Sequence, residues 1–234
     1  MYEQTQGYAQ YQQPPVGAID ASRRAQFITR TYTHLLAAII GFTAIEVVLF
    51  QTGLALPIAQ AMLGVGWLLV LGGFMLAGWL FSGMAARAQT RSAQYVALAG
   101  YVLAEAIIFV PLLVIADIEA PGAISSAALL TLVGFGALTG IAMTTAKDFT
   151  FLGGILRWAG VAALLLIVGG VLFGFQLGMF FSFAMVVFAG ATILYSTSRI
   201  LRTYPEDRYV SAALELFASV ALMFWYVLRI FSRR

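Results

Sequence analysis

Charge is scarce in this sequence, and cysteine is absent. Only 10% of the 234 residues are Asp, Glu, Lys or Arg, whereas 62% are hydrophobic; an ordinary globular domain has about 25% charged residues. The lack of cysteine excludes disulfides, thiolate metal sites and cysteine nucleophiles. The single histidine, His34, excludes a histidine-rich zinc site. The few charges that remain are therefore informative about function.

Several enzyme signatures are also missing. The sequence has no phosphate-binding loop and no HExxH metal motif. The long apolar stretches contain no aspartate, as an intramembrane aspartyl protease would require, and Ser–His chemistry would have only His34 available. No basic patch is interleaved with aromatic residues, so nucleic-acid binding is not expected. We expect a protein that is not an enzyme and that has no cofactor and no metal site.

What the sequence does contain is seven long apolar stretches. A membrane-spanning helix needs about 20 mostly apolar residues, and each stretch is long enough and lacks the alternation of a barrel strand. The sequence thus predicts an all-α polytopic membrane protein, with one seven-helix domain over 27–234 in contact with the lipid bilayer. The predicted spans are Thr31–Phe50, Pro57–Phe81, Ala93–Ile115, Ile124–Thr145, Phe151–Phe173, Met179–Leu201 and Val210–Phe231.

The first residues differ from the rest in composition. Met1–Asp20 is rich in Gln, Tyr and Pro and contains no apolar run, so it does not look like a signal peptide. We expect 1–26 to be a disordered cytoplasmic tail.

The positive charges predict the orientation. If the seven spans alternate, ten basic residues fall on one side of the membrane, which the positive-inside rule assigns to the cytoplasm of a bacterial inner membrane together with the N-terminus. The other side would hold Asp117, Glu119 and three C-terminal arginines, which leaves open whether the last helix crosses fully or dips in and returns. The ten residues are Arg23, Arg24, Arg30, Arg87, Arg91, Lys147, Arg157, Arg199, Arg202 and Arg208.

Three carboxylates lie within the predicted spans. A charge at the centre of a bilayer costs about 3 kcal/mol or more, so such residues usually face the interior of the bundle, a cavity or a partner. Glu105 is mid-span and is the strongest functional candidate; the alternative is a buried, hydrogen-bonded carboxyl group. Glu46 lies near the outer end of the first span, where interfacial exposure explains it as well as function does.

Glu215 belongs to a polar stripe in the last span. Ser211, Glu215 and Ser219 are spaced four residues apart and share one helix face. The preceding span carries the polar run Ile193–Ile200 (ILYSTSRI), which includes Ser196. If these two helices pack antiparallel, their polar faces meet near the cytoplasmic side. The alternative is that these residues only provide hydrogen bonds between helices.

Four segments together resemble the Bax inhibitor-1 family in its bacterial form. FITRTY at Phe27–Tyr32 resembles the entry to the family's first helix, and TAKDFTFLGGIL at Thr145–Leu156 resembles the connection between its fourth and fifth helices. ILYSTSRI is similar to the family's sixth-helix signature, and Ala212–Phe231 is similar to its closing helix. Glu105 falls where many members carry a glutamate. The resemblance covers Phe27 to Phe231.

This resemblance implies a seven-helix fold with a cytoplasmic N-terminus and the last helix at its centre. Known members act as pH-sensitive calcium leaks, in which an aspartate pair on the last two helices binds a proton or a cation. The corresponding positions here are Ser196 and Ser219, which do not titrate. Arg87 is the nearest counterpart of the basic residue that partners the pair.

Two functions follow as expectations. The first is a cation leak, with Ca²⁺ as the expected ion. Glu105 and Glu215 would form the charged lining, Ser196 and Ser219 would be polar neighbours, and Ca²⁺ or H⁺ would be the bound ion. The second is a regulator or partner of a membrane-anchored FtsH-type protease, with Met1–Asp20 as the handle. Another bacterial branch of the family has that role and also lacks an acid in its last helix.

Overall fold

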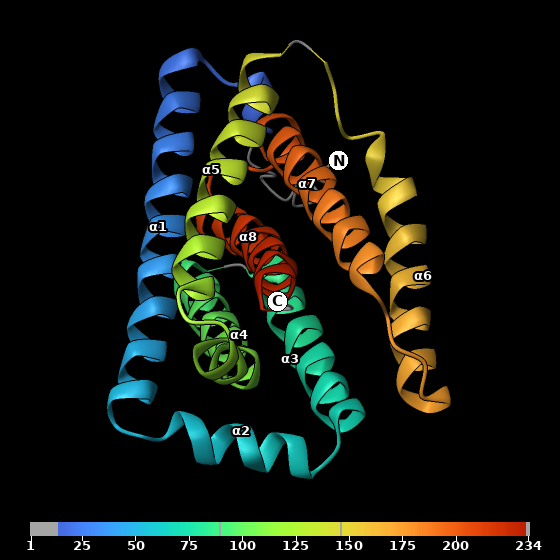
Figure 1. Ribbon diagram of the computed structural model, residues 1–234. Coiled ribbons are helices and arrows are strands. Elements are labelled where there is room, and N and C mark those ends of the chain that lie inside the picture. The colour runs from blue at the N-terminus through green and yellow to red at the C-terminus, as the bar shows by residue number, and fades with distance from the viewer. Residues whose placement is uncertain (1–13, 89, 146, 233–234) are drawn as a thin grey trace, which may run out of the picture.

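The structure is a computed structural model that describes residues 14–88, 90–145 and 147–232. The described residues form helices and no β-strand (Figure 1). A single turn of 3₁₀-helix, η1, precedes eight α-helices. Their bounds are η1 Val16–Ala18, α1 Ala21–Gln51, α2 Ala55–Gly64, α3 Trp67–Arg87, α4 Arg91–Glu119, α5 Ala123–Thr144, α6 Leu152–Phe173, α7 Met179–Thr203 and α8 Tyr209–Phe231.

Seven of these helices, all except α2, are long and apolar enough to cross a membrane. The predicted all-α fold with seven spans is therefore confirmed. The prediction of one helix over Pro57–Phe81 is wrong, because the chain breaks between α2 and α3. Gly66 has a backbone φ of 94°, a left-handed value that favours glycine and interrupts an α-helix. The short α2 lies across the ends of its neighbours (Figure 1).

The start of the chain also differs from the expectation. Residues 1–13 of the predicted tail lie outside the described part. The rest of that segment forms η1 and the first turn of α1. Asp20 is the N-cap of α1, where its side chain accepts a 3.0 Å hydrogen bond from the backbone N–H of Arg23. The helix begins ten residues before the predicted Thr31. The prediction missed this start because the first three turns are amphipathic and not purely apolar.

The last helix lies at the centre of the bundle. In the most apolar window of α8, 72% of the residues are buried, against 6% in α3 and in α6. It packs against α1, α4, α5 and α7. It is also continuous from Tyr209 to Phe231, so the chain does not turn back within this span. The predicted central position of the last helix is therefore confirmed.

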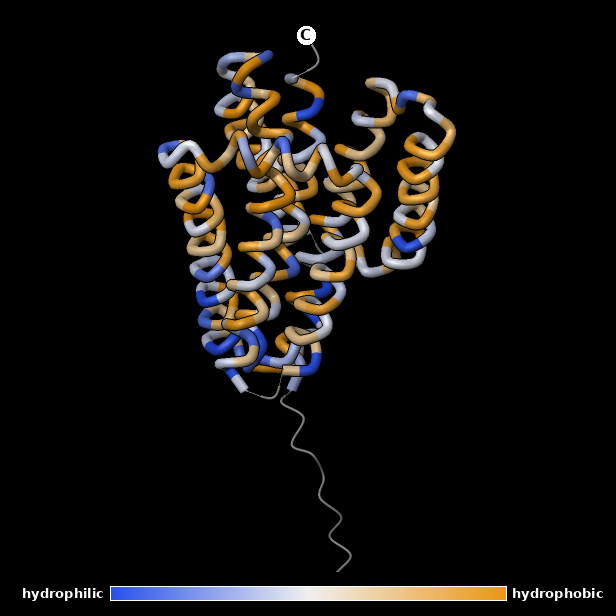
Figure 2. Tube along the Cα trace, turned by 90° about the horizontal axis from the view of Figure 1, so that it is seen from below, coloured by the Kyte–Doolittle hydropathy of each residue, from blue (hydrophilic) through white to orange (hydrophobic). Residues whose placement is uncertain are grey.

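Four chain segments meet at one end of the bundle, which we call the basic end. Arg23 at the start of α1 pairs with Glu206 in the α7–α8 connection. Arg202 Nε lies 3.6 Å from Asp148 in the α5–α6 connection, and α4 begins beside the same end. Hydrophilic residues gather toward this end, while the helix surfaces beyond it are mainly hydrophobic (Figure 2). Glu119, at the far terminus of α4, marks the opposite end.

Candidate functional site

A cavity of about 1170 Å³ runs between α3, α4, α6, α7 and α8. Its lining includes Ala85 and Tyr204 at the basic end and Glu119 and Ser232 at the opposite end. The cavity therefore follows the length of the bundle. Most of its lining is apolar, so its few polar side chains determine what chemistry it can support.

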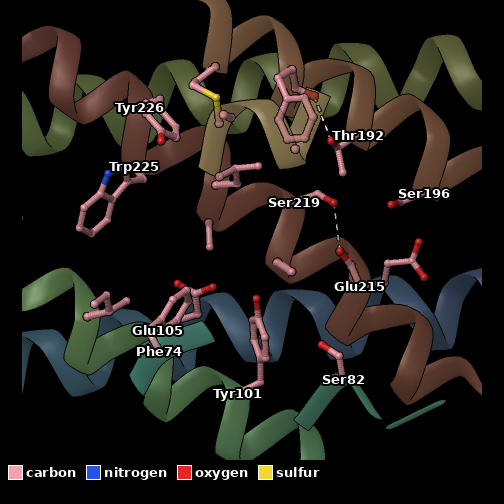
Figure 3. Close-up of a pocket in the computed structure, with 18 of the residues that line it drawn as sticks. Phe74, Ser82, Tyr101, Glu105, Thr192, Ser196, Glu215, Ser219, Trp225 and Tyr226 are labelled. Atoms are coloured by element: carbon pink, nitrogen blue, oxygen red, sulfur yellow. Dashed lines mark hydrogen bonds between the residues drawn. The ribbon is translucent and has the colours of Figure 1, made fainter. Parts of the chain in front are cut away.

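Four of the five residues that we selected from the sequence line this cavity. Glu105 comes from α4, Ser196 from α7, and Glu215 and Ser219 from α8 (Figure 3). The fifth, Arg87, is the last residue of α3; it is exposed and is not part of the lining. The helix packing thus brings together residues that are up to 114 positions apart in the sequence.

Glu105 is buried in the middle of α4 and contributes a carboxyl group to the cavity. Tyr101, one helical turn earlier, lines the same wall. Figure 3 shows Glu105 near Phe74 of α3, on the side of the cavity toward Trp225, whereas Glu215 lies beyond Tyr101. The two carboxylates are therefore separate along the cavity. Among the described residues, no three His, Asp or Glu side chains come together as a metal-binding group.

Glu215 is engaged by two residues of the preceding segment. The guanidinium of Arg199 forms an ion pair with its Oε2, and the hydroxyl of Tyr204 donates a 2.6 Å hydrogen bond to the same oxygen. Burial raises the pKa of the Tyr204 phenol above its usual range, and the neighbouring Glu215 carboxylate adds to the shift. Tyr204 therefore stays protonated and remains a donor at neutral pH.

Arg199 is also held by aromatic rings. Its guanidinium carbon lies 5.4 Å from the ring centre of Tyr195 and 5.6 Å from that of Tyr204, within the range of cation–π attraction. Its side chain is 39% exposed, so the pair with Glu215 is only partly shielded from water. The sequence indicated Arg199 as a cytoplasmic charge and as part of the polar run Ile193–Ile200, and it gave Tyr204 no role. A polar run ending in Arg199 opposite a lone glutamate was the signal for their pairing.

Ser196 and Ser219 are both buried and face each other across the cavity from α7 and α8 (Figure 3). The hydroxyl of Ser219 donates to the carbonyl of Glu215 at 3.1 Å, a bond within its own helix. The two serine hydroxyls can therefore offer neutral oxygen ligands, and neither of them titrates.

The α3 and α8 helices are tied together at the basic end of the cavity. Ser211 Oγ donates to the carbonyl of Ala85 at 2.9 Å, and the guanidinium of Arg208 donates to the carbonyl of Ala86. The amide oxygen of Gln94 accepts a 3.3 Å bond from the backbone N–H of Ser211. The first two bonds satisfy two of the last carbonyls of α3, and the third joins α4 to α8, so this end of the bundle is fixed in place.

A second cavity, of about 330 Å³, holds the third carboxylate of the predicted spans. Glu46 lines it, together with Asp117 and Thr131. Glu46 is 7% exposed, so the expectation of interfacial exposure is wrong, and neither carboxylate oxygen has a hydrogen-bond partner among the described residues. This cavity is almost entirely apolar otherwise.

His34 lies near the basic end, outside both cavities. Its Nε2 is 2.8 Å from the hydroxyl of Tyr95, and its Nδ1 is 2.7 Å from the carbonyl of Arg30. The residue is half-buried on α1. It is an interfacial histidine with two hydrogen-bond partners.

Comparison with known proteins agrees with the fold. The family described as "Inhibitor of apoptosis-promoting Bax1" matches residues 24–234. An uncharacterized protein of Pseudomonas aeruginosa is 37% identical over 113 residues, which are 47% of this chain and 49% of that protein. The aligned part thus spans about half the length of this relative. Because the family match covers nearly all of the chain, this multi-pass helical membrane protein belongs to the Bax inhibitor-1 family.

Proposed function

We propose that this protein is a cation leak of the bacterial inner membrane, with Ca²⁺ as the ion and no enzymatic activity. The observation that carries the proposal is the 1170 Å³ cavity, whose lining includes residues from both ends of the bundle and the carboxylates Glu105 and Glu215. Carboxylates in a mainly apolar wall attract a cation and repel anions. Of the arginines that also line the cavity, Arg199 is paired with Glu215. Carboxylate and hydroxyl oxygens are also the ligands that a hard cation such as Ca²⁺ accepts.

The proposal includes an orientation. The basic end, where the connections 145–151 and 204–208 meet the start of α1, faces the cytoplasm according to the positive-inside rule. The N-terminus then lies in the cytoplasm and Glu119 lies on the outer side. A cation entering from outside would pass Glu105 before it reaches Glu215.

The ion pair between Arg199 and Glu215 acts as the inner gate in this proposal. While the pair is formed, the carboxylate that a cation needs is already neutralised, and a positive guanidinium stands in the path. Tyr204 supports the closed arrangement through its bond to Glu215. Opening requires the guanidinium to move off Glu215, after which Glu215, Ser196 and Ser219 offer oxygen ligands.

The test is Ca²⁺ flux into liposomes that contain the purified protein, measured across a pH series. Flux above that of empty liposomes is expected, and Glu105→Gln should abolish most of it. Glu46→Gln is the matched control, because it also neutralises a buried glutamate but lies outside this cavity. Absence of flux at every pH, or equal flux in Glu105→Gln and wild type, rejects the leak.

The second candidate is a regulator or partner of a membrane-anchored FtsH-type protease. It is favoured by the serines at both positions where the family's aspartate pair stands, Ser196 and Ser219, because the cavity then lacks the usual proton site. In this case deletion of Met1–Asp20 should change proteolysis of the protease's substrates, while Glu105→Gln should have no effect. The leak predicts a loss of flux in Glu105→Gln and no effect of that variant on proteolysis.

A further inference from the structure

Arg157 is a charged residue inside a membrane-spanning helix. It lies one and a half turns into α6, near the basic end, and its side chain is exposed. Within the described part of the chain, no hydrogen bond, ion pair or ring contact of its guanidinium is found. Burying an arginine at such a depth costs free energy unless its guanidinium reaches water or an anion. We therefore expect a negatively charged group beside Arg157.

The face of α6 that carries Arg157 forms one wall of the central cavity. Gly153, Leu156, Gly160, Leu164 and Ile167 recur every three or four residues along this face and line the cavity with it. The opposite wall includes Phe74 of α3. Since both α3 and α6 are largely unburied, and α6 stands to one side of the bundle in both views (Figures 1 and 2), this side of the cavity adjoins the bilayer.

The charge balance at this end of the cavity is positive. Gly153, one turn before Arg157, abuts the ring of Tyr195, since a Cβ at that glycine would lie 2.8 Å from the ring. The same ring lies beneath the guanidinium of Arg199. Arg157 and Arg199 both line this part of the cavity, and Glu215 neutralises only Arg199. One positive charge remains at the mouth of an apolar cleft.

We propose that an anionic phospholipid occupies this cleft, with its phosphate on Arg157 and one acyl chain along the Leu156–Ile167 face of α6. A phosphodiester carries the single negative charge that the site lacks, and a basic pocket between membrane helices at the cytoplasmic surface favours anionic headgroups. The chain fits because the cleft beyond Arg157 is lined by leucine, isoleucine and phenylalanine side chains. A zwitterionic headgroup carries its own cation and gains less from Arg157.

This lipid would close the side of the cavity that protein leaves open between α3 and α6. The inference does not depend on whether ions cross the protein, because it concerns only the occupant of the cleft. It assigns α6 a role that neither its packing nor the carboxylates explain.

The test is native mass spectrometry of the full chain in detergent, incubated with an equimolar mixture of phosphatidylglycerol and phosphatidylcholine. One phosphatidylglycerol is expected to bind in preference to phosphatidylcholine by about fivefold, the effect of one arginine beside an anionic lipid. Arg157→Gln should remove this preference. Arg24→Gln is the matched control, because Arg24 is also exposed and near the basic end but does not line the cavity.

A second variant tests the acyl-chain part of the cleft. Leu164→Trp fills the apolar wall and keeps Arg157, so it should lower the binding of both lipids. Unchanged preference in Arg157→Gln, or an equal loss in Arg24→Gln, would overturn the proposal. Displacement of the lipid by millimolar inorganic phosphate would also overturn it, because it would show a site for the free anion and not for a lipid. The unfolding temperature of each variant shows whether it is folded.

Discussion

The backbone N–H of Val16 donates a 2.8 Å hydrogen bond to the carbonyl of Tyr204. Val16 is fully buried, and its neighbour Pro15 pairs with Pro205 as an isolated antiparallel bridge. The segment before α1 is therefore fastened to the connection between α7 and α8. That connection also carries the Tyr204 hydroxyl that donates to Glu215 at the inner end of the cavity.

Replacing Gly17 should detach this segment. A Cβ at Gly17 would lie 2.9 Å from the carbonyl oxygen of Arg202, closer than real Cβ atoms come, so the backbone has to move. We expect Gly17→Leu to lower the free energy of unfolding by about 1–3 kcal/mol, the usual effect of overpacking. Hydrogen exchange should show loss of protection at the Val16 amide.

Gly136→Leu is the control for this change. Gly136 is in α5, and a Cβ there meets no atom within 4 Å. It should keep both the stability and the protection of Val16. If Gly17→Leu keeps the Val16 amide protected, the segment is not fastened by this contact.

The effects of Arg199 and Glu215 on the free energy of unfolding should be coupled. Removing either partner leaves the other charge partly buried, whereas removing both does not. We expect Arg199→Gln and Glu215→Gln each to cost about 1–3 kcal/mol, less than a fully buried pair because the arginine is 39% exposed. The double variant should cost less than the sum of the two, as measured by unfolding in detergent. Strict additivity would mean that the two charges do not stabilise each other.

The positions of the helices could be predicted from the sequence better than their pairings. A run of about 20 apolar residues is sufficient to identify a span, so all seven were found. The break near Gly66 was missed because Pro57–Phe81 is apolar throughout, and hydropathy alone does not register a change of direction. The sequence GVG at Gly64–Gly66 was the local signal for that break.

The residues that line the cavity could also be predicted from the sequence better than their partners. Glu105 and Glu215 were identified because a carboxylate within a span is costly and has to face the interior of the bundle. The partner of Glu215 depends on how α7 and α8 are rotated against each other, and residue spacing along one helix does not fix that rotation. Arg87 was selected by likeness to the family, but Arg208 is the residue that reaches the end of α3.

Glu46 should reduce stability, because both of its carboxylate oxygens are buried without a hydrogen-bond partner. Burying a polar group without a partner costs about 1–3 kcal/mol, so Glu46→Met should raise the free energy of unfolding by a similar amount. Thr43, one turn earlier on α1, lines the same cavity and offers the control Thr43→Val. A fall in stability in Glu46→Met would show that the carboxylate has a stabilising partner such as a bound cation.

Asp148 should give a small dependence of stability on pH. The backbone N–H of Thr150 donates to its carboxylate at 2.9 Å and is the main cause of a pKa below the usual value; Arg202 contributes in the same direction. Because the folded pKa lies below that of the unfolded chain, about 3.9, the stabilisation is present above that pH and is lost as the pH falls through the folded value. Unfolding temperatures from pH 7 to pH 3 should fall less in Asp148→Asn than in wild type. Parallel curves would contradict this.

Restoring carboxylates at Ser196 and Ser219 should give the protein a proton-sensitive cavity. Both hydroxyls are buried and face each other from α7 and α8 (Figure 3), so aspartates at these positions would lie close together. Two close carboxylates repel each other, and the pKa of one rises until the pair shares a proton. The double variant Ser196→Asp/Ser219→Asp should therefore show Ca²⁺ flux into liposomes that changes across pH 5–8 more steeply than in wild type. The single variant Ser196→Asp is the control, since one carboxylate lacks the repelling partner. If the single and double variants have the same pH profile, the two positions are not coupled across the cavity.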